Sequence, residues 1–176
     1  MADFYQKIVE QQGTVEDIIR KLPGFKGYFD KNDRRDADRL LREQLVRTFE
    51  EAQAQFGQLQ KELIESSGGL AHMEHTQSID TKLRTFIDRI ESAAQGYAGL
   101  FDAVKVREDA LARVYAFDNA LFAYRDQFDE GLATLKDALG TEAVRDVLRQ
   151  LDAVVTEANN TFKRRIEAMQ GLHDAV

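Results

Sequence analysis

The stretch LREQLVRTFEEAQAQFGQLQKEL, residues 41–63, carries the pattern that decides the fold. Apolar residues recur in it at steps of three or four, which places them on one stripe of a helix with a heptad rhythm typical of coiled coils. The residues between them are mostly Arg, Glu and Gln, which favour helix. The stripe comprises Leu41, Leu45, Phe49, Ala52, Phe56, Leu59 and Leu63. The pattern predicts a long amphipathic helix over about residues 31–66, ended by Ser66-Ser67-Gly68-Gly69.

The same spacing of apolar residues recurs in other parts of the chain and predicts further helices over about residues 3–22, 77–95, 107–139 and 142–173. Pro23 ends the first of these, and Gly140 with Thr141 separates the last two. No stretch shows the two-residue alternation of a strand. We therefore expect an all-α fold, an elongated antiparallel four-helix bundle of long helices, with residues 3–22 as an extra N-terminal helix.

Composition favours a single helical domain over residues 1–176. Of the 176 residues, 43% are hydrophobic and 31% are charged, and none is cysteine, which excludes disulfides and thiolate metal sites. No apolar run approaches the ~20 residues of a membrane span. The N-terminus lacks the basic and apolar regions of a signal peptide, so we expect a cytoplasmic protein.

Charge disfavours a nucleic-acid partner. The chain carries 24 Lys and Arg against 31 Asp and Glu, a net charge of −7, whereas nucleic-acid binding depends on neutralising phosphates. Local basic runs occur at Arg34-Arg35 and at Lys163-Arg164-Arg165, each with acidic neighbours. We expect no nucleic acid among the partners.

Two glycine- and aromatic-rich segments interrupt the helical pattern: KLPGFKGYFD, residues 21–30, and GYAGLFDAVKV, residues 96–106. Proline and glycine shape turns, so the aromatic side chains either close the end of the bundle or form a docking surface for a partner. The charged run that follows the first segment either forms a self-compensated solvated helix face or supplies arginine anchors, a residue type enriched in interaction hot spots. The candidate partner-binding residues are Phe25, Tyr28, Phe29, Arg34, Arg35, Tyr97 and Phe101.

Asp118 and Arg125 fall close to the apolar stripe of the 107–139 helix. We expect them to flank that stripe, the alternative being a buried pair with another helix that fixes register. His72 and His75, with Glu74 between them, are expected in an exposed loop, because no clear fourth metal ligand accompanies them. No histidine has Glu three residues before it, so the di-iron bundle signature is missing, and common catalytic motifs are missing too. We expect no metal, no cofactor and no catalytic residue.

Two blocks, KLPGFKGYFDKNDRRDADRLLRE (residues 21–43) and GYAGLFDAVKVREDALARVYAFD (residues 96–118), resemble a family of uncharacterised bacterial all-helical proteins. That family carries a PGxxGY turn before an RRxAD helix. The resemblance covers about a quarter of the chain and implies a bacterial origin without an activity. It rests on Pro23, Gly24, Gly27, Tyr28, Arg34, Arg35, Asp36, Tyr97, Phe101, Asp102 and Lys105.

These features favour a non-enzymatic helical scaffold or adaptor that binds a protein partner or a second copy of itself. The first alternative is a peripheral membrane protein, because residues 1–22 form an amphipathic stripe. Residues 1–22 carry three basic and four acidic residues, and this net charge of −1 does not favour binding to anionic lipid. The second alternative is a bundle that binds a metal or a small ligand.

Overall fold

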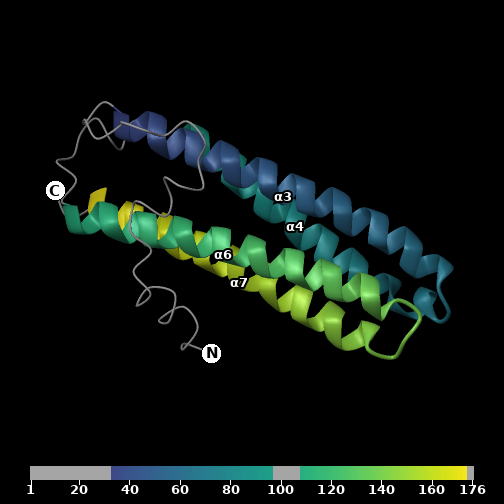
Figure 1. Ribbon diagram of the computed structural model, residues 1–176. Coiled ribbons are helices and arrows are strands. Elements are labelled where there is room, and N and C mark those ends of the chain that lie inside the picture. Colours follow the sequence, from purple (N-terminus) through teal and green to yellow (C-terminus); the bar gives the residue numbers. More distant parts are fainter. Residues whose placement is uncertain (1–32, 97–107, 174–176) are drawn as a thin grey trace.

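The computed structural model describes residues 33–96 and 108–173, and in these residues the chain is helical apart from two short turns (Figure 1). The long helices are α3 (Asp33–Glu65), α4 (Met73–Gly96), α6 (Glu108–Ala138) and α7 (Val144–His173), and a short 3₁₀ helix, η1 (Gly69–His72), precedes α4. The predicted all-α bundle is confirmed. The predicted N-terminal helix, residues 3–22, lies outside the described residues.

Three of the four helices begin and end within two residues of the predicted positions, whereas α4 begins at Met73 instead of residue 77. The prediction of an exposed loop for the histidines is therefore wrong: His72 ends η1, and His75 lies in the first turn of α4. The apolar stripe conceals this start, because the buried position one turn before Ile79 is occupied by a polar residue, Thr76.

The helices form two antiparallel hairpins, α3–α4 and α6–α7, whose turns lie at the same end of the molecule (Figure 1). Contacts join α3 to α4, α4 to α7, α7 to α6 and α6 to α3, which closes a ring of four. Since both turns lie at one end, the hairpins meet through parallel pairs, α3 beside α6 and α4 beside α7. Hydrogen bonds of Lys82 to Asp152 and of Arg89 to Asn159 share a sequence offset of 70, as parallel neighbours require.

The two ends of the bundle differ in what they contain. At one end, which we call the hairpin end, lie the turns around Gly68 and Gly140, both with a φ of +75°, a conformation that favours glycine. Gly69 is required for space, since a Cβ there would lie 1.6 Å from the Leu63 carbonyl oxygen. At the other end, which we call the terminal end, α3 begins, α4 ends, α6 begins and α7 ends.

Apolar side chains fill the length of the bundle. Every residue of the stripe predicted between Leu41 and Leu63 is buried. Phe86 of α4 contacts both Phe49 of α3 and Phe162 of α7 edge to face, with ring centroids 4.7 and 6.0 Å apart. Such aromatic pairs add to the stabilisation from burial alone, so this cluster ties three helices together at one level.

Candidate functional site

The candidate partner-binding residues all belong to segments that join the bundle at the terminal end. Phe25, Tyr28 and Phe29 precede α3, while Tyr97 and Phe101 follow α4, and all five lie outside the described residues. The backbones of Arg34 and Arg35 form part of the first turn of α3, and their side chains are not described. Because α3 and α4 are neighbours, the structure brings the attachment points of the two glycine-aromatic segments to the same end of the molecule.

A buried ion pair joins α6 to α7 near the terminal end. The Nε of Arg165 donates to Oδ1 of Asp118 at 2.6 Å, and Nη2 donates to Oδ2 at 3.3 Å. Arg165 is 0% exposed and Asp118 is 1% exposed. The expectation that Asp118 flanks the apolar stripe is therefore wrong, and the alternative of a buried pair with another helix is right for it. Arg165 therefore does not contribute to a basic surface patch at residues 163–165, because its side chain is buried in the core.

Arg125 is buried as well and ties α6 to α3. Its Nε donates to the carbonyl oxygen of Thr48 at 2.6 Å, and its guanidinium pairs with the carboxylate of Asp129 one turn further along α6. The expectation that Arg125 merely flanks the stripe is wrong too. Its buried partner on the other helix is a backbone carbonyl and not an acidic side chain.

Buried charge is concentrated in one half of the bundle. We call the part between the terminal end and the level of Thr48 and Arg125 the terminal half, and the remainder the hairpin half. In the described part of the chain, the buried charged side chains are those of Arg42, Asp118, Arg125 and Arg165, and all of them lie in the terminal half. Removing charge from water is costly, so these groups restrict which helix faces can meet.

Tyr124 of α6 is a further buried titratable group, next to Arg125 in the sequence. Burial raises the pKa of its phenol above the ordinary 10.0, and the Thr161 hydroxyl on α7 partly opposes that rise. The neighbouring charges of Glu157 and Arg164 act in opposite directions on the same pKa. The phenol therefore stays protonated in the folded protein at neutral pH.

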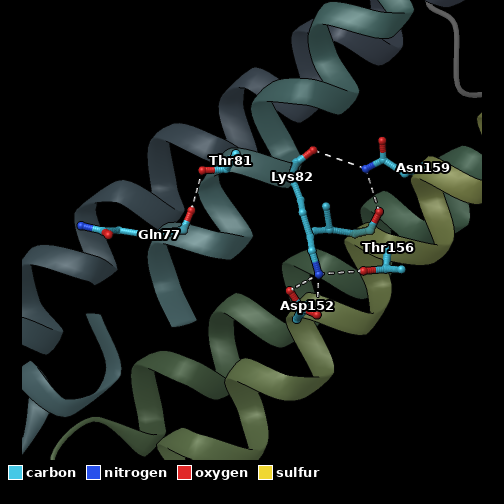
Figure 2. A network of polar contacts seen from close by, with 7 residues as sticks. Gln77, Thr81, Lys82, Asp152, Thr156 and Asn159 are labelled. Carbon is cyan, nitrogen blue, oxygen red and sulfur yellow. Dashed lines mark hydrogen bonds and ion pairs between the residues drawn. The ribbon is translucent and has the colours of Figure 1, made fainter. Parts of the chain in front are cut away.

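A polar clamp connects the parallel helices α4 and α7 on the surface (Figure 2). Lys82 Nζ lies 2.6 and 2.7 Å from the two carboxylate oxygens of Asp152 and 3.1 Å from the Thr156 hydroxyl, which uses its three donor hydrogens. The Asn159 side chain donates to the Lys82 carbonyl oxygen and accepts from Arg89. These contacts between α4 and α7 fix the register of the two hairpins.

An open groove of about 830 Å³ runs between α3 and α4 toward the terminal end. Its lining includes Val46, which is partly exposed, and the buried side chains of Ile90 and Arg42. Its exposed rim carries the carboxylates of Glu43, Glu50, Asp88 and Glu91 against one exposed cation, Arg47. The exposed side chains at the border of the groove are therefore mainly acidic.

A second hollow lies at the hairpin end and is lined by Ala71, His72, Glu74, His75, Ser78 and Arg145. Across residues 33–96 and 108–173, no group of three or more His, Cys, Asp or Glu side chains is arranged to hold a metal ion. In the same residues, no helix is both long and apolar enough to cross a membrane.

Comparisons of the chain with protein-family models, with curated proteins and with solved structures find no match. The resemblance of the two glycine-aromatic segments to a bacterial helical family stays a prediction.

Proposed function

We propose that the protein is a non-enzymatic helical scaffold or adaptor of the bacterial cytoplasm, which binds a protein partner or a second copy of itself through the terminal end. The observation that carries this proposal is the position of the helix termini. Both glycine-aromatic segments attach to the same end of the bundle, because α3 begins where α4 ends and α6 begins. Aromatic side chains and arginines are the residue types that dominate interface energetics.

The terminal half supports this proposal in a second way. Its buried ion pair and the Arg125 hydrogen bond to the Thr48 carbonyl oxygen hold three helices in a defined arrangement. Helices held in one defined arrangement reduce the ordering cost of binding, and therefore favour affinity for a partner. The net charge of −7, together with an Arg165 that is turned inward, favours a protein partner over nucleic acid.

Light scattering and partner capture test the proposal with the full chain. One variant carries Phe25→Ala and Tyr28→Ala, and a second carries Tyr97→Ala and Phe101→Ala. The matched control is Leu70→Ala, because Leu70 is an apolar residue at the hairpin end that is 71% exposed.

We expect self-association at micromolar concentration, or a captured protein, in the wild type and in the Leu70→Ala control. In both terminal-end variants, the affinity of this association should fall at least about tenfold, as it does when interface hot spots are substituted. A strictly monomeric wild type that captures nothing would contradict the proposal, as would equal losses in the control and in the terminal-end variants.

A further inference from the structure

The side-chain contacts between the parallel helices α4 and α7 repeat with the period of a heptad. Lys82 of α4 donates to the carboxylate of Asp152 on α7 (Figure 2). One heptad further along both helices, Arg89 donates to the side-chain oxygen of Asn159. Each pair sets a cationic side chain of α4 against an oxygen acceptor of α7, and its two residues differ by 70 in sequence. A heptad spacing keeps positions on one seam, so the next pair of the seam lies one heptad closer to the hairpin end.

That next pair is His75 of α4 and Arg145 of α7, which differ by 70 in sequence as well. Both residues line the hollow at the hairpin end, which has a volume of about 560 Å³. A guanidinium carries donors and no acceptor, and an imidazole carries at least one N–H donor. Within residues 33–96 and 108–173, neither side chain makes a hydrogen bond or an ion pair. This position of the seam therefore lacks the oxygen acceptor that the other two positions contain.

Two further hydrogen-bond donors border the same hollow. His72 of η1 and the hydroxyl of Ser78 on α4 line it beside His75 and Arg145. In the part of the chain that the structure describes, these two side chains have no hydrogen-bond partner either. The hollow therefore collects imidazole, hydroxyl and guanidinium donors from η1, α4 and α7. Since α4 and α7 both begin at this end, the positive ends of their dipoles add to the charge of Arg145.

We propose that this hollow binds a phosphate group. A phosphate monoester presents three strongly accepting oxygens, which match donors that come from two helices and supply the acceptor that the seam lacks at this position. Arginine suits such a ligand, because its planar fork of N–H donors fits two phosphate oxygens at once. The hollow is larger than a phosphate ion, so the ligand is a small molecule that carries the phosphate as a monoester.

Glu74 limits the affinity of the site for an anion. Its carboxylate lines the hollow and repels a phosphate group, but it is exposed, so water and salt screen the repulsion. We expect inorganic phosphate to bind with a Kd of about 1 mM. Replacing the carboxylate by a neutral amide, in Glu74→Gln, should tighten that binding by about twofold to fivefold.

NMR of the histidine rings tests the site in the full chain, because two of its three histidines line the hollow. The third, His173, ends α7 at the terminal end and is a control within the same sample. During titration with inorganic phosphate at constant pH and ionic strength, the ring signals of His72 and His75 should shift along one saturation curve. The signal of His173 should stay in place. Glycerol 3-phosphate should bind at least as tightly as inorganic phosphate, whereas acetate should bind at least about tenfold more weakly, since it offers fewer oxygens and less charge.

A matched pair of arginine variants gives a second readout. Arg145→Gln should weaken the binding of inorganic phosphate at least about tenfold, because it removes a charged hydrogen-bond donor from the hollow. Arg149→Gln is the control, since Arg149 is also an exposed arginine of α7 but pairs with Asp146 and does not line the hollow. The control should change the affinity less than about twofold. Urea denaturation verifies that both variants are folded.

Three results would overturn the phosphate site: no saturable shift of His72 and His75 up to about 20 mM phosphate, equal binding of acetate and phosphate, or equal losses in the two arginine variants. Glycerol 3-phosphate that binds more weakly than inorganic phosphate would contradict the monoester as the ligand. None of these readouts involves a protein partner, and the hollow lies at the opposite end of the bundle from the segments assigned to partner binding. The phosphate site is therefore tested independently of the proposed function.

Discussion

The terminal half and the hairpin half of the bundle are built from the same four helices but differ in what they bury. In the hairpin half, the buried polar side chain of the described residues is that of Thr76, and glycine turns close the end. In the terminal half, Asp118 and Arg165 form an ion pair inside the core, and Arg125 reaches the backbone of α3.

The two halves therefore contribute differently to the stability of the bundle and to the choice of which helix faces meet. Apolar burial contributes roughly 25 cal/mol for each Å² removed from water, so the hairpin half supplies much stability without requiring a particular partner for each side chain. A buried ion pair adds little net stability, because desolvation offsets the attraction between the charges. It does penalise every arrangement that leaves one charge alone, so the terminal half defines how α6, α7 and α3 meet.

The largest expected effect comes from Asp118→Ala, which leaves the guanidinium of Arg165 buried without its carboxylate. We expect this change to lower the free energy of unfolding by about 3–5 kcal/mol. The double variant Asp118→Leu, Arg165→Met should recover most of the loss, because similar apolar volume replaces both charges. Urea denaturation of the single and double variants measures both values. A double variant as unstable as Asp118→Ala would show that the pair is not an isolated unit.

Gly69→Ala tests the hairpin half through backbone geometry. The added Cβ would lie 1.6 Å from the Leu63 carbonyl oxygen, so the turn between α3 and α4 has to shift. We expect a loss of about 2–3 kcal/mol in the free energy of unfolding, the scale of local backbone strain.

Gly57→Ala is the matched control for that change. A Cβ at Gly57 of α3 meets nothing within 4 Å, so this change should stabilise the protein by about 0.5–1 kcal/mol through helix propensity. Thermal and urea unfolding compare the two alanine variants. The account of the turn is wrong if they shift stability equally.

Lys82→Ala tests the polar clamp that joins the two hairpins. The clamp with Asp152 is about one-third exposed, with 38% and 26% side-chain exposure. We therefore expect its removal to cost about 1 kcal/mol or less, and less still at high salt. The control is Lys61→Ala, an exposed lysine of α3. Urea titrations at two salt concentrations check the difference, and a loss that does not depend on salt would contradict an electrostatic clamp.

Tyr124→Phe should produce the smallest effect at neutral pH and a visible one in alkali. Because burial raises the pKa of Tyr124 in the folded state, the folded protein holds this proton more tightly than the unfolded chain. Its contribution to stability is complete below pH 10 and is lost as the pH rises through the raised pKa. We expect the wild type to lose more stability than Tyr124→Phe above pH 10, measured by urea denaturation across that range. If the two proteins lost stability equally with rising pH, the raised pKa of Tyr124 would be contradicted.

The sequence predicts the helices well because burial follows the helical period. The stripe from Leu41 to Leu63 is buried at every predicted position, and Gly140 ends α6 as expected. The start of α4 could not be predicted in this way, because Thr76 occupies a stripe position with a polar side chain. Its hydroxyl donates to the Met73 carbonyl oxygen, which satisfies it within the helix.

The buried ion pair could not be predicted from the helical period. A helical period identifies which face is inside, but not which neighbouring helix supplies a partner for a charge on that face. Arg165 stands three residues after the buried Phe162, a stripe position that the basic run around it conceals. That spacing, set against Asp118 on the stripe of α6, is the signal that points to the pair.

The sequence identifies the candidate partner-binding residues by their composition, but it does not predict where in the fold they attach. Proline, glycine and aromatic residues mark two segments, and the topology of the bundle attaches both to the terminal end. The spacing of these residues does not indicate that the two attachment points lie at one end of the bundle. That placement follows from the antiparallel hairpin of α3 and α4, which returns the end of α4 to the start of α3.

Amide hydrogen exchange of the full chain tests most directly whether the terminal half is the less stable part of the bundle. Since the buried charges of the terminal half add little net stability, the account predicts that amides of residues 41–48 and 159–165 exchange at least about tenfold faster than those of residues 56–63 and 147–154. The double variant Asp118→Leu, Arg165→Met should narrow that gap. Equal protection in the two halves, or stronger protection in the terminal half, would contradict the account.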